Sequence, residues 1–137
     1  MTTIVPEQVQ LCFRAAKNLA NMHLPYEWGG GHPGPGITHG QKGYDCSGLV
    51  SDVLRHGGIL ESSEALDTAE LLDWGDLGIG TFMTVWVING PELQHTFLEF
   101  KIPDEEEYKW FMAAHTGTII GWFKGVSTKG YTPRRRK

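Results

Sequence analysis

The spacing of apolar residues in the first half of the chain predicts two amphipathic helices. Apolar residues recur at three- and four-residue intervals over residues 6–22 and again from Cys46 to Leu54, which is the spacing of a single helix face. Pro6 suits the first turn of the earlier helix. Asp45 is a favourable N-cap for the later helix, and Gly57-Gly58 is a stop signal after it. Cys46 should therefore lie in the first turn of a short helix.

The pattern changes to that of strands in the second half. Asp67 and Glu70 form a capping box that opens a short helix reaching about Trp74, and glycines interrupt the chain over residues 75–80. β-Branched and aromatic residues then fill four segments, residues 82–88, 94–100, 110–115 and 118–123. Because the segments follow one another closely, we expect an antiparallel sheet. Helices followed by such a meander predict an α+β domain.

Between the two predicted helices, residues 23–45 have the composition of a loop. Glycine and proline dominate residues 29–36, which excludes a helix or an interior strand. Glycine lets a backbone approach a ligand closely, so we expect this loop to form a wall of a cleft. The spacing of His23, His32 and His39 fits no compact zinc pattern. We therefore expect these three side chains to be solvated and the protein to hold no metal.

Composition and charge narrow the class of protein. A chain of 137 residues with a net charge of −4 is one domain, and its charge argues against nucleic acid as the main partner. No apolar run approaches the ~20 residues of a membrane span. The first residues lack the basic and apolar regions of a Sec signal, so we expect synthesis in the cytoplasm and another route to any target outside it. Cys12 and Cys46 do not make a disulfide framework, and Cys12 lies on the predicted buried helix face. We expect a monomer.

The last nine residues, 129–137, are strongly basic. We expect a domain over residues 1–128 followed by a disordered, solubilising tail. The alternative is that the tail attracts the molecule to an anionic cell-wall polymer.

The position predicted for Cys46 has chemical consequences. The first turn of a helix exposes unpaired N–H groups and the positive end of the helix dipole, and both favour thiolate over thiol. The same N–H groups can hold the oxyanion of a tetrahedral intermediate. The alternative is that Cys46 is a small apolar residue on a buried helix face.

Two segments carry a resemblance to a known family. The first is Pro25-Tyr26-Glu27-Trp28-Gly29-Gly30, and the second, after a loop, is Tyr44-Asp45-Cys46-Ser47-Gly48-Leu49-Val50. This arrangement resembles the NlpC-type cell-wall peptidases, which are papain-like cysteine peptidases, and in particular the peptidase modules of actinobacteriophage lysins. The resemblance covers residues 6–124. It implies a papain-like α+β fold with N-terminal helices packed on an antiparallel sheet.

The resemblance also implies catalytic roles. Cys46 corresponds to the nucleophile, His95 at the start of a strand to the general base, and His115 at a strand end to the residue that orients the base. A base is needed on physical grounds, because cysteine is only a few per cent thiolate near neutral pH and histidine titrates there. We expect the helix of Cys46 to pack against the sheet face that bears both histidines.

Further residues correspond to substrate contacts in the family. Tyr26 is a candidate for a substrate or oxyanion contact, and Trp28 is a candidate aromatic wall of the cleft. Asp45 and Ser47 correspond to residues that recognise the free amino end of the stem peptide. Helix capping by Asp45 and first-turn filling by Ser47 are compatible alternatives.

The activity implied by the resemblance is hydrolysis of peptidoglycan stem peptides at the γ-D-glutamyl–diaminopimelate bond, without a cofactor. The alternatives are an N-acetylmuramoyl-L-alanine amidase, another amide hydrolase or acyltransferase on the same fold, and a non-catalytic phage structural or cell-wall-binding module. The expected place of action is the cell wall, as a phage lysin, a tail-associated enzyme or an exported effector.

Overall fold

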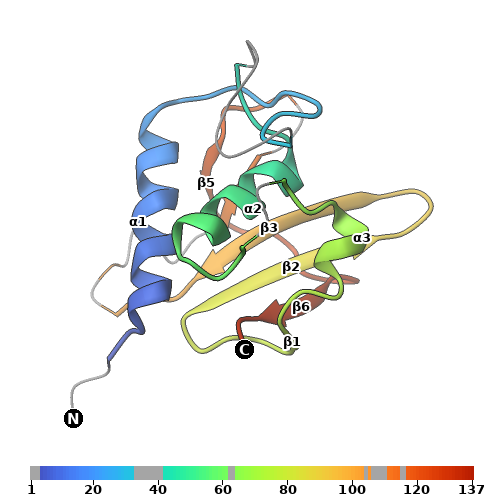
Figure 1. The fold of residues 1–137 in the computed structure, drawn as a ribbon. Coiled ribbons are helices and arrows are strands. Elements are labelled where there is room, and N and C mark those ends of the chain that lie inside the picture. Colours follow the sequence, from blue (N-terminus) through green and yellow to red (C-terminus); the bar gives the residue numbers. More distant parts are fainter. Residues whose placement is uncertain (1–3, 33–41, 62–63, 104, 106–110, 115–116) are drawn as a thin grey trace.

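The computed structural model describes residues 4–32, 42–61, 64–103, 105, 111–114 and 117–137. Two helices cover one face of an antiparallel sheet, and a third, short helix lies beside the end of α2 farther from α1 (Figure 1). The helices are α1 (Glu7–Asn21), α2 (Cys46–His56) and α3 (Thr68–Leu71). The α+β fold with N-terminal helices on an antiparallel sheet is thus confirmed.

Within the described residues, six strands form a single sheet in the order β1-β6-β2-β3-β4-β5. Their bounds are β1 (Asp76–Leu77), β2 (Met83–Asn89), β3 (Gln94–Phe100), β4 (Phe111–Ala113), β5 (Gly121–Phe123) and β6 (Thr132–Arg135). The hairpin of β2 and β3 is the longest pairing, and its register runs from Met83 opposite Phe100 to Asn89 opposite Gln94. This hairpin is the scaffold on which α2 packs.

The two sheet faces bury different clusters, because successive strand residues point to opposite faces. On the helix side, Leu98 and Phe100 of β3 pack with the apolar faces of α1 and α2. Cys12 belongs to this core and is fully buried, as its place on the helix face predicted. On the other side, Phe97 packs with Trp86 and Tyr131. The first helix and the Cys46 helix therefore follow the periodicity of the sequence.

The predicted strand over residues 118–123 is shorter in the structure. β5 begins only at Gly121. The preceding residues pair with the loop after α1: Ile119 forms an antiparallel bridge with Pro25, and the Ile120 N–H donates to the Leu24 carbonyl at 2.7 Å. These residues therefore hold the loop that carries Tyr26 rather than extending the sheet.

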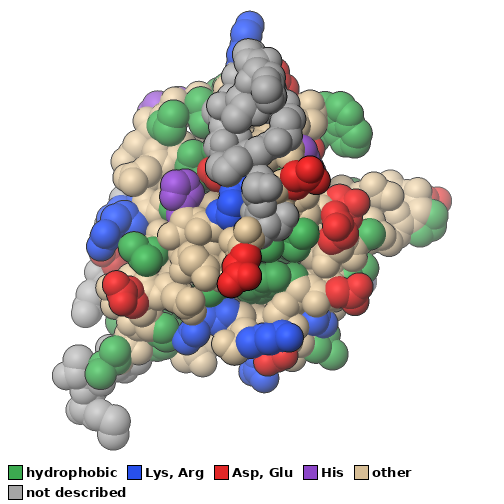
Figure 2. Space-filling view, in the orientation of Figure 1, with side chains coloured by type: hydrophobic (Ala, Val, Ile, Leu, Met, Phe, Trp, Pro, Cys, Tyr) green, Lys and Arg blue, Asp and Glu red, His purple; other side chains and the backbone are tan. Residues whose placement is uncertain are grey.

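The expectation of a disordered C-terminal tail is wrong for residues 132–135. They form β6, which lies between β1 and β2 with Pro133 opposite Trp86. The Arg134 guanidinium donates to the carbonyls of Trp74 at 2.7 Å and Gly75 at 3.1 Å. Basic side chains gather at the end of the molecule where β6 and the C-terminus lie (Figure 2). The basic composition of this segment did not indicate a strand, because Arg134 binds backbone carbonyl groups rather than facing solvent as a tail would.

None of the helices within the described ranges combines the length and the apolar character that a membrane span requires.

Candidate active site

The thiol of Cys46 lies at the N-terminus of α2, as the sequence predicted. Asp45 is the N-cap residue, and its Oδ1 accepts from the Gly48 N–H at 2.8 Å. The apolar residues that follow, Leu49, Val50 and Val53, are completely buried against the sheet. Local capping and core packing therefore fix the first turn of α2 and with it the position of the sulfur.

A backbone-on-backbone contact holds the loop 25–32 against the start of α2. The Asp45 N–H donates to the Gly30 carbonyl at 3.2 Å, and the Glu27 N–H donates to the Tyr44 carbonyl at 3.0 Å. A Cβ atom on Gly48 would lie 2.0 Å from the Gly30 oxygen, closer than any real side chain approaches. Only glycine at this position allows the loop to lie directly on the helix.

The loop, α2 and α3 enclose a cleft of about 280 Å³ beside the sulfur. All four residues predicted to contact substrate line it together with the nucleophile. The lining residues are Tyr26, Trp28, Gly29, His32, Asp45, Cys46, Ser47, Asp67, Thr68 and Gln94. Trp28 is 85% exposed, so its indole stands out from the surface at the margin of the cleft, where a ligand can stack on it.

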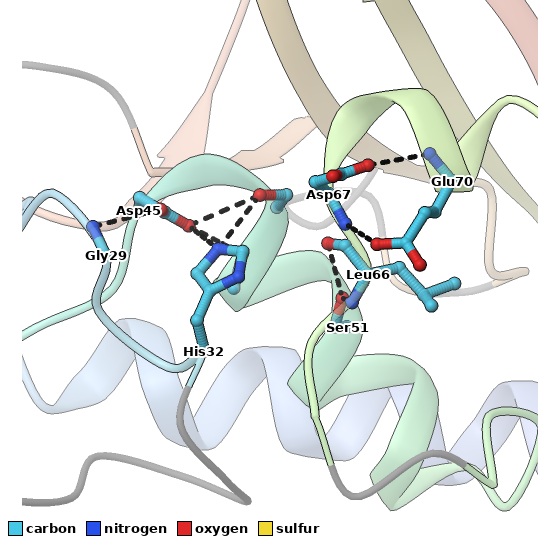
Figure 3. Close-up of polar contacts among 9 residues, drawn as sticks. Gly29, His32, Asp45, Ser51, Leu66, Asp67 and Glu70 are labelled. Atoms are coloured by element: carbon cyan, nitrogen blue, oxygen red, sulfur yellow. Dashed lines mark hydrogen bonds and ion pairs between the residues drawn. The ribbon is translucent and has the colours of Figure 1, made fainter.

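His32 is bonded within this cleft and is not a solvated loop residue, so the expectation for it was wrong. Its Nε2 lies 2.7 Å from Asp45 Oδ1 and 3.1 Å from Ser47 Oγ (Figure 3). The other Asp45 oxygen accepts from the Gly29 N–H at 3.1 Å. The hydrogen bond that His32 donates to Asp45 raises the pKa of His32, and partial burial opposes this increase.

The sequence offered one indication for His32, its place two residues after the Pro25–Gly30 motif. His23 is exposed, whereas His39 lies outside the described residues.

The electrostatics of Cys46 differ from the expectation of a depressed pKa. Burial raises the pKa of the thiol, and the nearby Asp45 carboxylate raises it further. The backbone N–H groups of Thr96, Ser47 and Cys46 itself lower the pKa but do not outweigh burial. The N–H groups at the helix terminus therefore lower the pKa of Cys46 as predicted. Burial and the neighbouring carboxylate outweigh them, so the net change in pKa is an increase.

His95 lies near the start of β3, one residue before Thr96, whose N–H interacts with the Cys46 sulfur. Its ring contacts Phe97 with centroids 5.8 Å apart and Tyr131 edge-on at 6.4 Å. These contacts put His95 on the sheet face that bears Phe97, whereas α2 covers the opposite face. The expectation that α2 packs against the face bearing His95 was therefore wrong, because side chains alternate along β3.

Two further residues complete the description of this region. Tyr131, which the sequence did not indicate, has its pKa raised by burial and by the charge of Cys46, so it lies near both His95 and the sulfur. His115 lies outside the described residues; Ala114 before it is buried. Within the part of the chain that the structure describes, no three His, Cys, Asp or Glu side chains group closely enough to hold a metal ion.

Helices on a six-stranded antiparallel sheet, with a cysteine at a helix N-terminus, form the NlpC/P60 fold, as similarities to solved structures show. The chain is similar to a Staphylococcus aureus protein of the NLP/P60 family with a TM-score of 0.60 and 16% identity. The peptidoglycan hydrolase RipB of Mycobacterium tuberculosis has a TM-score of 0.60 and 18% identity. RipD of the same organism, a non-catalytic NlpC/p60 domain protein adapted to peptidoglycan binding, has a TM-score of 0.62 and 17% identity.

The match covers 99% of this chain and 44% of the Staphylococcus aureus protein, so the chain spans less than half of that protein's length. It covers 96% of this chain and 68% of RipB, and 96% of this chain and 98% of RipD. No protein-family model and no curated protein matches the sequence.

Proposed function

We propose that this chain is a cysteine peptidase that hydrolyses peptidoglycan stem peptides. The observation that carries the proposal is the Cys46 thiol in the first turn of α2, open to a cleft and approached by the N–H groups of Ser47 and Thr96. Such N–H groups stabilise the oxyanion that forms when a thiolate adds to an amide carbonyl. Tyr26, which lines the same cleft, is a further candidate donor to the oxyanion.

The proposed reaction has two steps. In the first, Cys46 adds to the amide carbonyl while His95 takes the thiol proton; the C–N bond then breaks, and His95 gives that proton to the departing amine. In the second, His95 takes a proton from water and the resulting hydroxide adds to the thioester. The C–S bond then breaks, and His95 gives the proton to the departing sulfur, which restores the thiol and the neutral imidazole. Because Cys46 has a raised pKa, proton transfer to His95 must accompany attack.

His95 and His115 are proposed as base and orienting residue. The position of His95 next to Thr96 supports its role, since the Thr96 N–H interacts with the sulfur. The side chain of His95 belongs to the face of β3 opposite α2. The His95 imidazole and the Cys46 thiol would therefore meet around the edge of β3. Within the described residues, β4 pairs with β3 at Leu98 and Glu99. This pairing begins after His95 and Thr96, so it does not cover the edge of β3 beside them. The role of His115 rests on the sequence resemblance.

The scissile bond proposed is γ-D-glutamyl–diaminopimelate, with the muramoyl–L-alanine amide as the alternative. Both follow from the resemblance of residues 25–30 and 44–50 to NlpC-type peptidases. The same resemblance supports a phage lysin or tail-associated enzyme that acts on the cell wall. Trp28, whose exposed indole borders the cleft, is proposed to contact the bound wall fragment.

A second candidate function is peptidoglycan binding without catalysis. It is favoured by the raised pKa of Cys46, which leaves little thiolate at neutral pH. The likeness in fold to RipD, a non-catalytic protein, also supports it.

Mass spectrometry of purified muropeptides incubated with the protein separates these functions. The peptidase should release fragments cut at one amide bond, whose masses identify the bond. Cys46→Ala should abolish the products, and His95→Ala should reduce turnover by about 10²–10⁴-fold. His56→Gln is the matched control, since this exposed histidine of α2 pairs with Asp52 away from the cleft. Retention of muropeptides without any product would favour the binding module.

A further inference from the structure

The bonding of His32 fixes which of its ring nitrogens carries a proton. Nε2 lies 2.7 Å from a carboxylate oxygen of Asp45, and an ionised carboxylate only accepts hydrogen bonds. Nε2 is therefore protonated both when the imidazole is neutral and when it is charged. The atom that gains or loses a proton on titration is Nδ1, which makes no hydrogen bond to any residue that the structure describes.

The Asp45 carboxylate is largely occupied by donors of its own chain. Oδ1 accepts from the Gly48 N–H and from His32, and Oδ2 accepts from the Gly29 N–H. An ionised carboxylate has about four acceptor sites. His32 thus occupies one oxygen of Asp45 and itself lines the cleft, with 28% of its side chain exposed.

The charged groups around His32 come from two elements. Asp45 precedes α2, and Asp67 and Glu70 belong to the N-terminal turn of α3; all three carboxylates act on His32 in the same direction. In Figure 3 the His32 ring lies between Asp45 and the start of α3. Neutral His32 therefore presents an acceptor atom in negatively charged surroundings, whereas charged His32 presents a donor.

We propose that His32 determines the specificity of the cleft by accepting, through Nδ1, a hydrogen bond from an N–H donor of the bound peptide. The donor is either a free ammonium or an amide N–H, since both offer the same chemistry to the acceptor. Neutral His32 binds the donor, and protonated His32 rejects it, because Nδ1 then carries its own hydrogen. The proposal rests on the stem-peptide substrate proposed above.

The size of the effect follows from competition between one proton and one ligand. The apparent affinity equals the intrinsic affinity multiplied by the fraction of neutral His32. Affinity should thus fall about tenfold per pH unit below the pKa of His32 and be constant above it. Because the hydrogen bond to Asp45 raises the pKa of His32 above its ordinary value of 6.5, this change falls at a higher pH than it would for an ordinary histidine.

Peptide binding to the Cys46→Ala protein tests the proposal without interference from the nucleophile. Calorimetric titrations between pH 5.5 and 8.5, roughly a unit or more on each side of an ordinary histidine pKa, use the tripeptide L-Ala-γ-D-Glu-diaminopimelate with a free or an acetylated amino terminus. We expect the affinity to rise with pH until His32 is neutral. In His32→Gln, whose amide can donate to Asp45 and present a carbonyl that does not titrate, the affinity of the acetylated peptide should be independent of pH. That of the free-amine peptide should follow only the loss of its own ammonium proton near pH ~8. His56→Gln should keep the original profile.

Each outcome has a definite meaning. A pH dependence with the free amine but not the acetylated peptide identifies the donor as ammonium, and a dependence with both identifies an amide N–H. Parallel pH profiles for His32→Gln and its parent would overturn the role of His32, as would an Nδ1–H tautomer in the imidazole ¹⁵N spectrum. In either case, muropeptide cleavage by the wild-type protein would still support the proposed function. If neither peptide binds and no muropeptide is cut, the proposed function fails and this inference fails with it.

Discussion

Replacement of Gly48 by alanine has two opposing effects on stability where the loop 25–32 lies on α2. In a helix interior, alanine is favoured over glycine by about 1 kcal/mol. At this position, however, the new Cβ would lie 2.0 Å from the Gly30 carbonyl oxygen and 3.0 Å from Asp45 Oδ1. The obstacle is backbone and cannot rotate away, so the loop must move by about 1 Å to reach a normal contact.

The steric clash of the new Cβ atom should outweigh the gain in helix propensity. Overpacking of a filled site costs about 1–3 kcal/mol. Displacing the loop also weakens the hydrogen bonds from the Asp45 N–H to Gly30 and from the Gly29 N–H to Asp45, each of which contributes about 1 kcal/mol. After subtraction of the helix-propensity gain, we expect a net destabilisation of about 1–3 kcal/mol. For a domain of this size that lowers Tm by about 4–12 °C.

Thermal unfolding followed by circular dichroism measures this effect. Gly121→Ala is the matched control, because a Cβ atom there meets nothing within 4 Å, and its Tm should change by no more than about 2 °C, since surface substitutions cost about 0.5 kcal/mol or less. The pKa of His32 should also fall in Gly48→Ala as its contact with Asp45 loosens. An increase in Tm for Gly48→Ala would refute the packing of the loop on α2.

Four further predictions concern charge, the pH dependence of stability, reactivity and the last strand. Asp45→Asn keeps the capping oxygen but removes the charge, so the pKa values of both Cys46 and His32 should fall, measured by alkylation rates against pH and by NMR; unchanged values would contradict the assigned cause. Because the folded-state pKa of His32 is raised, its pairing with Asp45 should stabilise the fold below about pH 6.5. This stabilisation should be lost as pH rises through the folded-state pKa. A Tm difference between wild type and His32→Gln that does not shrink over this pH range would argue against it. Iodoacetamide should modify Cys46 much faster than Cys12, which is fully buried with its pKa raised to about 12; equal rates in the native protein would contradict this. A chain ending at residue 128 lacks β6 and should lose cooperative unfolding, whereas removal of residues 136–137 should not; a cooperative melt of the shorter chain would contradict the pairing.

The features that the sequence predicts well are those that a few neighbouring residues decide. The N-cap at Asp45 and the capping box of Asp67 with Glu70 are both present. Each is encoded by residues three apart, and the apolar spacing after Cys46 specifies which helix face is buried. The predicted cleft wall also follows from local chemistry, since glycines allow the loop to approach the helix.

The features that it predicts poorly depend on partners distant in the chain. β6 pairs with a strand about fifty residues earlier in the chain, since Pro133 lies opposite Trp86. The basic residues of β6 also do not have the apolar pattern of a buried strand. The bond between His32 and Asp45 joins residues thirteen positions apart in the sequence. The pKa of Cys46 is raised by burial, which only the packed structure determines.

The position of β6 has a consequence for biosynthesis. β2 lies next to β6 in the finished sheet, yet residues 132–135 are translated after every other strand. Until then one side of β2 has unpaired N–H and C=O groups flanked by Val85, Trp86 and Val87, all of them buried in the native protein. Such an exposed apolar edge is prone to pair with other chains. Among the described strands β6 is thus the one that covers this side of β2, and any state of the chain in which β6 has not paired, during synthesis or refolding, is prone to aggregate through this edge.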